Sequence, residues 1–160
     1  MARAVARLHL NPGSTAPGIT KDAVFRFCYE NEIIGVGWSV GPPAKEPFTW
    51  PDYLSANKRP LTSQKTLHGL AMGDLVWVKA PSGQHFLTEI VGGWEYRWQP
   101  DYVAMDIINI RPVRFVPVKS ARVPEGLAES FSLRRTCLRV RSNKELIEST
   151  LALWAALEAG

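Results

Sequence analysis

The chain has 160 residues, of which 46% are hydrophobic and 21% are charged, and these values are typical of a globular protein rather than a disordered chain. No apolar run approaches the length of about 20 residues that a membrane helix needs, and the N-terminal stretch lacks the apolar core of a signal peptide. We therefore expect a cytoplasmic protein with a single domain over residues 1–160.

The positive charge gathers in the C-terminal half. The net charge of the whole chain is +4, whereas Arg97 to Lys144 contains ten basic and four acidic residues, a surplus of six. A basic region in a chain with six tryptophans favours a polyanionic partner, above all nucleic acid. A solvated basic face is the alternative, and charge alone would favour it.

The first part of the chain predicts two strands around a helix. Ala4–Leu10 alternates like a half-buried strand, with Arg7 on its polar side. Thr20 is a suitable N-cap for a helix that runs to about Asn31. Ile33–Trp38 is the second strand, and its two glycines indicate that a backbone or a ligand passes close by.

A proline-rich segment, Gly41–Pro60, follows. Its four proline interruptions exclude a long regular element, but a single turn near Trp50–Ser55 is compatible with them. Segments of this length are often lids over a site, so Trp50 and Tyr53 are site candidates. Thr62–Met72 then predicts a short helix before Gly73.

The centre of the sequence is a hairpin. Two apolar strands, Leu75–Lys79 and Phe86–Val91, flank a tight turn that contains Gly83. An aromatic cluster comes next, and alternation places its three rings on one face of the extended chain, with Glu95 and Arg97 on the other. The three rings are Trp94, Tyr96 and Trp98.

The C-terminal part predicts two strands and a helix. Tyr102–Val118 is a long β-rich run and Thr136–Val140 is a short last strand. Ser142 and Glu145 have the spacing of a capping box for a helix over 142–158 that packs on the barrel.

The sequence contains no motif of a familiar catalytic or metal site. Cys28 and Cys137 lie far apart outside any CxxC, which predicts buried apolar cysteines, no zinc and no cofactor. GxSxG, HExxH and P-loop motifs are absent. Carboxylate pairs can be imagined, Asp101 with Asp106 or Glu89 with Glu95, but neither sits in a recognisable catalytic arrangement. We expect a protein that is not an enzyme.

The order of these elements is β-α-β-loop-α-β-β-β-β-α. Short strands predominate, and the regular βαβ alternation of a doubly wound parallel sheet is missing. The pattern predicts an α+β fold in which a small mixed β-barrel carries peripheral helices.

Three motifs in this order resemble the EVE domain of the PUA-like superfamily. They are Ile34–Trp38 (IGVGW), Met72–Val76 (MGDLV) and Glu89–Tyr96 (EIVGGWEY). The chain is likewise similar to the EVE-like N-terminal domains of modification-dependent restriction enzymes of the Mrr and McrB kinds. The resemblance covers roughly residues 4–118. It implies a PUA-like, EVE-type barrel that flips a modified base of nucleic acid into an aromatic pocket, as YTH domains do with methylated adenine in RNA.

The resemblance also implies site residues. Trp38 would form one wall of the pocket and one aromatic of the 94–98 cluster another, whereas without the resemblance Trp38 is better interpreted as a core residue. Ser39 would bond the base edge or only form a turn. The base-pocket candidates are therefore Trp38, Ser39, Trp50, Trp94, Tyr96 and Trp98, and the phosphate candidates are Arg97, Arg134, Arg135, Arg139 and Arg141.

The expected partner is nucleic acid that carries a modified base, with DNA favoured over RNA and an effector protein acting in trans. The first alternative is an RNA-binding or RNA-cleaving PUA-like protein. The second is a protein-interaction subunit of a defence or phage system. Binding that weakens steeply with salt would separate the nucleic-acid hypotheses from the last one.

Overall fold

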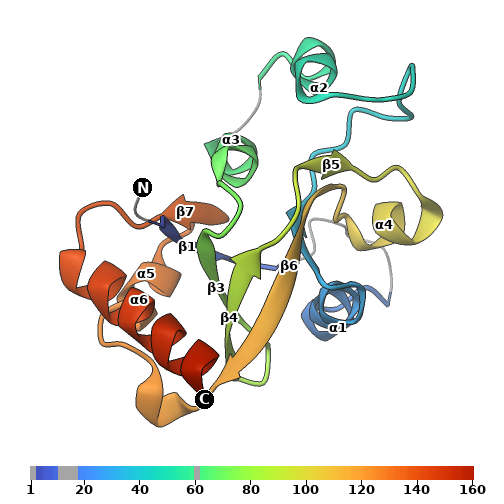
Figure 1. Cartoon of the computed structure of the whole chain (residues 1–160). Coiled ribbons are helices and arrows are strands. Elements are labelled where there is room, and N and C mark those ends of the chain that lie inside the picture. Colours follow the sequence, from blue (N-terminus) through green and yellow to red (C-terminus); the bar gives the residue numbers. More distant parts are fainter. Residues whose placement is uncertain (1–2, 11–17, 60–61) are drawn as a thin grey trace.

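The computed structural model describes residues 3–10, 18–59 and 62–160, and seven strands within these ranges form one sheet (Figure 1). Pro60, at the end of the predicted proline-rich segment, lies outside the described residues. The strands are β1 (Val5–Leu8), β2 (Ile33–Val36), β3 (Leu75–Lys79), β4 (His85–Ile90), β5 (Glu95–Tyr96), β6 (Asn109–Val118) and β7 (Cys137–Arg139). The helices are α1 (Lys21–Asn31), α2 (Trp50–Ala56), α3 (Thr62–Gly69), α4 (Pro100–Met105), α5 (Leu127–Ser132) and α6 (Lys144–Ala159), with a 3-10 turn, η1 (Ser120–Arg122).

The sheet is mixed and curled. Its order is β2-β6-β4-β3-β1-β7, with β5 paired to β6, and β1 runs parallel to β3 while the other pairs are antiparallel. Helix α3 packs against both end strands, β2 and β7, so it spans the opening between the two edges. The predicted α+β fold, a barrel-like mixed sheet with peripheral helices, is confirmed.

Two apolar cores lie on opposite faces of the sheet. One contains Val24 and Cys28 of α1 and Tyr102 of α4. The other contains Leu127 of α5 and Trp154 of α6. In Figure 1, α1 and α4 accordingly flank one side of the strands and α5 and α6 the other, with α2 and α3 at the top. The core positions of Cys28, Cys137 and Trp154 agree with the sequence pattern.

Strand β1 differs from its prediction because it is buried on both faces. It lies between β3 and β7, and Arg7, predicted on a polar face, is 0% exposed. Its guanidinium donates to the carbonyls of Ser130 (2.8 Å) and Leu133 (3.2 Å) and to those of Arg135 and Thr136. Burial lowers the pKa of Arg7, and these carbonyls compensate for the lost water. Arg7 thus holds the chain that follows α5.

A second buried arginine, Arg111 of β6, holds α3. Its Nε donates to the carbonyl of Gly92 (2.9 Å), and its Nη1 to those of Leu67 (2.9 Å), His68 (3.2 Å) and Leu70 (2.6 Å). The carbonyls at a helix C-terminus lack partners within the helix, and the cation satisfies them. This contact positions α3 against β6 at the open side of the sheet.

The predicted strand over Tyr102–Val118 is wrong in its first part. Pro100 occupies the first turn of α4, a position that favours proline, and Asp106 ends that helix in a left-handed conformation (φ 54°). The strand therefore starts only at Asn109. Helix α5 was not predicted.

The predicted capping box of the last helix is also wrong. Asn143 is the N-cap, and its Oδ1 accepts a hydrogen bond from the amide of Leu146 (3.0 Å). Asparagine caps helices as well as serine does, so the start of α6 moves by one residue. The helix predicted over Thr62–Met72 already ends at Gly69. The central hairpin of β3 and β4 is confirmed, with Gly83 at φ 98° in its turn.

Arg111→Met should lower the free energy of unfolding by about 3 kcal/mol or more, because it leaves several buried carbonyls without a donor. Urea denaturation followed by circular dichroism measures this change. Arg114→Met on the same strand is the matched control, since Arg114 is half exposed and its ion pairs with Glu89 and Glu158 lie at the surface; its effect should stay below about 1 kcal/mol. Equal losses in both variants would contradict the assigned role.

Candidate nucleic-acid interface

Trp38 lies at the surface in an unusual backbone conformation. It follows β2 with φ 61°, in a region that residues other than glycine rarely occupy, and its side chain is 36% exposed. The Trp38 carbonyl accepts a hydrogen bond from the hydroxyl of Tyr53 (2.8 Å), and the Gly37 carbonyl accepts one from Asn109 Nδ2 (2.6 Å). These two bonds stabilise the turn that presents the indole to solvent.

The hydroxyl of Tyr53 joins four parts of the fold. Tyr53 belongs to α2 and is 0% exposed. Besides donating to Trp38, its oxygen is approached by Gln64 Nε2 of α3 (2.6 Å), Asn57 Nδ2 (3.0 Å) and Asn109 Nδ2 of β6 (3.3 Å). A hydroxyl oxygen has two acceptor lone pairs, so the long Asn109 contact is the weakest. Tyr53 is therefore a structural residue and not a ring that faces a ligand.

Trp38 shares an open hollow of about 470 Å³ with two other segments. One is the start of α3, at Thr62 and Ser63, and the other is the chain at 134–136 that Arg7 holds. Ser63 Oγ accepts a hydrogen bond from the amide of Cys137 (3.0 Å), which ties these two segments together. The fold thus brings Trp38 beside Arg134 and Arg135, both of which are exposed. Trp38 was predicted as a wall of the base pocket, and the two arginines were predicted separately as phosphate contacts.

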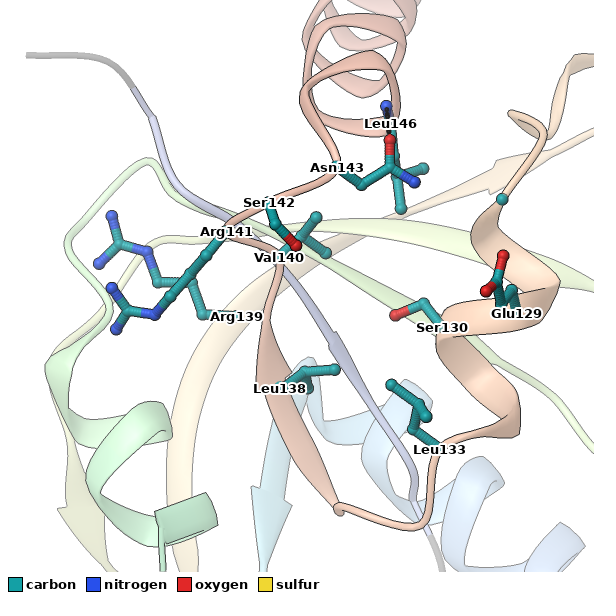
Figure 2. A pocket seen from close by; sticks show the side chains of 11 residues that line it. Glu129, Ser130, Leu133, Leu138, Arg139, Val140, Arg141, Ser142, Asn143 and Leu146 are labelled. Carbon is teal, nitrogen blue, oxygen red and sulfur yellow. Dashed lines mark hydrogen bonds between the residues drawn. The ribbon is translucent and has the colours of Figure 1, made fainter.

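The other phosphate candidates lie elsewhere. Arg139 and Arg141 are on the rim of a different cavity of about 430 Å³ between α5, β7 and the start of α6. Figure 2 shows both side chains pointing away from that cavity. Arg97 does not line the hollow of Trp38, because it is engaged with Glu95 (2.7 Å) and lies over the ring of Tyr102. Among the predicted phosphate contacts, the structure groups only Arg134 and Arg135 with Trp38.

Three predicted pocket aromatics anchor the 41–59 segment. Trp50 stacks on His68 (4.1 Å between ring centroids, 10° between planes) and meets Trp94 edge-on (5.2 Å). Trp94 Nε1 donates to Asn109 Oδ1 (3.0 Å). The hydroxyl of Tyr96 donates to the Gly41 carbonyl (2.7 Å). None of these aromatic residues lines the hollow beside Trp38; they fasten α2 and its flanks onto the sheet.

His68, which stacks on Trp50, was not among the predicted site residues. Burial, and then the nearby Arg111 cation, lower its pKa. An imidazole that is neutral near pH 7 can stack on an indole without the cost of burying a charge. It therefore belongs to the packing of α2 on α3.

Trp98 and Ser39 have different positions relative to Trp38. The ring of Trp98 is half-buried and parallel to that of Tyr96 (4°, 6.5 Å between centroids). It follows β5 on one side of β6, just as Trp38 follows β2 on the other. Ser39 Oγ accepts a hydrogen bond from the amide of Gly41 (2.9 Å), so it forms the turn that was the alternative to a base contact.

Two polar residues beside this site escaped the sequence analysis as site residues. Asn109 is 0% exposed and uses its amide to link Gly37, Tyr53 and Trp94. The signal in the sequence was an asparagine inside the apolar run at 107–110, since a buried amide must find partners. Asp106, considered only as half of an acid pair, lies with its carboxylate directly against Gly37.

The described residues contain no group of three or more histidine, cysteine or acidic side chains arranged to hold a metal ion. The helices of the described part are all too short or too polar to cross a bilayer.

Comparison with known proteins finds no matching family model and no matching curated protein. Three solved structures are similar over most of their length. The YTH domain of Zygosaccharomyces rouxii MRB1, in complex with N6-methyladenosine RNA, is 11% identical, with 95% of this chain and 86% of that chain covered and a TM-score of 0.43. The Pho92 YTH domain in complex with m6A is 12% identical, with 96% and 82% covered and a TM-score of 0.42. Atu2648 from Agrobacterium tumefaciens is 14% identical, with 93% and 92% covered and a TM-score of 0.39. At these values the matches assign the chain to no family, and the relation to restriction-enzyme domains stays a prediction.

Tyr53→Phe should leave the fold intact but loosen the turn at Trp38. The change removes the donor to the Trp38 carbonyl and the oxygen that three side-chain amides approach, so we expect a loss of about 1–3 kcal/mol in unfolding free energy. Hydrogen exchange should be faster at residues 37–39, as mass spectrometry of exchanged peptides can show. Tyr29→Phe, an exposed tyrosine, is the control and should change neither quantity. Unaltered exchange at 37–39 in Tyr53→Phe would remove the hydroxyl from this role.

Proposed function

We propose that this protein binds nucleic acid that carries a modified base and that it stacks this base, flipped out of its strand, on Trp38. One observation carries the proposal: an exposed indole, fixed in place by a buried hydroxyl, lies in the same hollow as two exposed arginines. The motif that contains Trp38 is one of the three that carry the resemblance to EVE domains. The proposed protein is a binding module without catalytic activity, and an effector activity would come from a partner.

The chemistry of the hollow suits a nucleotide. An indole face stacks on any base, with roughly 1–3 kcal/mol for each stacked base. Guanidinium groups beside it match the phosphate oxygens of the flanking backbone. An open hollow admits a base that has already left its stack, and unstacking costs least in single-stranded or damaged nucleic acid. Trp38 therefore supplies affinity for the ring, and Arg134 and Arg135 supply affinity for the chain that carries it.

The choice between DNA and RNA rests on the sequence resemblance alone. Similarity to domains of modification-dependent restriction enzymes favours DNA, which we propose as the first ligand class. The implied relation to YTH domains makes methylated RNA the alternative. Matched DNA and RNA oligonucleotides that carry N6-methyladenine, 5-methylcytosine, 5-hydroxymethylcytosine or no modification separate the two, with tryptophan fluorescence as the signal.

Trp38→Ala should abolish discrimination between modified and plain oligonucleotides and should weaken binding of the preferred one about 5- to 150-fold. Fluorescence anisotropy with a labelled oligonucleotide measures both effects. Tyr29→Ala, which removes an exposed aromatic ring on α1, is the control and should bind like the wild type. Discrimination that survives in a folded Trp38→Ala protein would refute the pocket.

Arg134→Ala combined with Arg135→Ala should weaken binding to all sequences alike. If each arginine neutralises one phosphate of a single strand, the slope of log K against log salt should flatten by about 1.4. Lys119→Ala with Arg122→Ala, two exposed basic residues at the 3-10 turn, gives the matched loss of charge and should leave the slope nearly unchanged. Equal slopes in both double variants would exclude the arginine pair from the interface, and no binding to any oligonucleotide would favour a protein partner instead.

A further inference from the structure

The carboxylate of Asp106 has no partner in the described part of the chain, although it is half-buried. The described residues offer it neither a hydrogen bond nor an ion pair, while the backbone amide of Asp106 is bonded to the carbonyls of Tyr102 and Val103. Burial raises the pKa of its carboxyl above the ordinary value. Burial has removed water from this carboxylate and has given it no donor from the described residues. A hydrogen bond from a ligand therefore stabilises it more than the same bond would stabilise an exposed carboxylate.

The position of this carboxylate relates it to Trp38. A Cβ added to Gly37 would stand 2.5 Å from each of the two carboxylate oxygens of Asp106. The side chain therefore lies on the backbone of the residue that precedes Trp38, in space that only glycine leaves open. The glycine at position 37, predicted to mark a close approach, accommodates this carboxylate.

The strand register places Asp106 just ahead of the part of β6 that pairs with both β2 and β5. On one side of β6, Val36 pairs with Asn109, and on the other side Tyr96 pairs with the same residue. Ile108 continues both ladders, because its amide donates to the Val36 carbonyl (3.0 Å) and its carbonyl accepts from the Arg97 amide (2.8 Å).

Trp38 follows the end of β2 and Trp98 follows the end of β5. Asp106 precedes the stretch of β6 with which both strands pair. Its carboxylate lies against Gly37, so it is next to the turn that presents Trp38.

We propose that Asp106 accepts a hydrogen bond from an exocyclic amino N–H of the flipped base, and so favours bases with an amino group, namely adenine, cytosine and guanine with their modified forms. The inference rests on the proposed function and deepens it. A carboxylate only accepts, so it matches an amino edge, whereas a base whose amino nitrogen carries two methyl groups offers no hydrogen. Asp106 would thus be the residue that determines which bases bind tightly when they stack on Trp38.

The test uses the full chain and short single-stranded oligonucleotides, in DNA and in RNA, that differ at one base. N6-methyladenine keeps one amino hydrogen and N6,N6-dimethyladenine has none. The corresponding cytosine pair is 5-methylcytosine and N4,N4-dimethylcytosine. The quantity compared within each pair is the dissociation constant of the dimethylated ligand divided by that of the amino-bearing ligand. Because both ligands of a pair stack, a change in stacking alone alters both constants and largely cancels in the ratio.

Asp106→Asn is the first variant, since asparagine tolerates the left-handed conformation that Asp106 adopts. It should weaken binding of the amino-bearing ligand about tenfold, because a neutral acceptor replaces a charged one, and should leave the dimethylated ligand unchanged. Gly37→Ala is the second variant. Its new methyl group must displace the carboxylate, so the same ratio should fall, and combining both changes should add little to either one.

Glu32→Gln is the matched control. Glu32 is also the left-handed C-cap of a helix, α1, but it is exposed at the far end of β2, so its variant should keep the wild-type ratio. Thermal melting checks that each variant is folded. Wild-type ratios in folded Asp106→Asn and Gly37→Ala would overturn the role of Asp106, while loss of discrimination in Trp38→Ala would still uphold the reader. Wild-type protein that selects no modified base would overturn both proposals.

Discussion

The hydroxyl of Tyr53 is the contact on which the candidate site depends. A single buried oxygen joins α2, α3, β6 and the turn after β2. Burying a hydroxyl without partners is costly, so the polar groups around it must stay together as long as the surrounding helices remain packed. The backbone of Trp38 is strained by its positive φ, and strain of this kind persists only where neighbouring structure over-determines it. The exposed indole is therefore a consequence of a buried polar network.

Two buried arginines hold the other segments that surround the hollow of Trp38. Arg111 satisfies the carbonyls at the end of α3 and Arg7 those after α5. Each is a charge that the protein interior accepts only because several carbonyls surround it. Arg7 bonds the carbonyl of Arg135. This bond fixes the backbone that carries the exposed side chains of Arg134 and Arg135. Buried cations hold the segments, and the exposed cations on one of those segments remain available to an anion.

The tryptophans divide into two roles that follow from their hydrogen bonding and stacking. Trp94 and Trp50 have partners for the indole nitrogen or the ring within the protein, and Trp77 bonds Thr150 inside the sheet–helix core. Trp38 is the exposed indole among the described tryptophans. Rings that are already stacked contribute a rigid frame, whereas an exposed ring next to cations offers a face to a ligand.

The sequence by itself determined the α+β class, the central hairpin and the buried cysteines, because alternation, turn residues and residue type are local signals. It could not separate Trp38 from Trp50, Trp94 and Tyr96, since an aromatic residue in a core and one in a pocket look alike in a sequence. Local pattern also misassigned Arg7, placed on a polar face, and residues 102–105, which form a helix. Only the tertiary structure decided that Arg134 and Arg135 join Trp38 while Arg97 and Arg139 do not, and that Asp106 lies against Gly37. These are contacts between segments far apart in the chain, and they depend on which strands pair and which carbonyls a buried charge must satisfy.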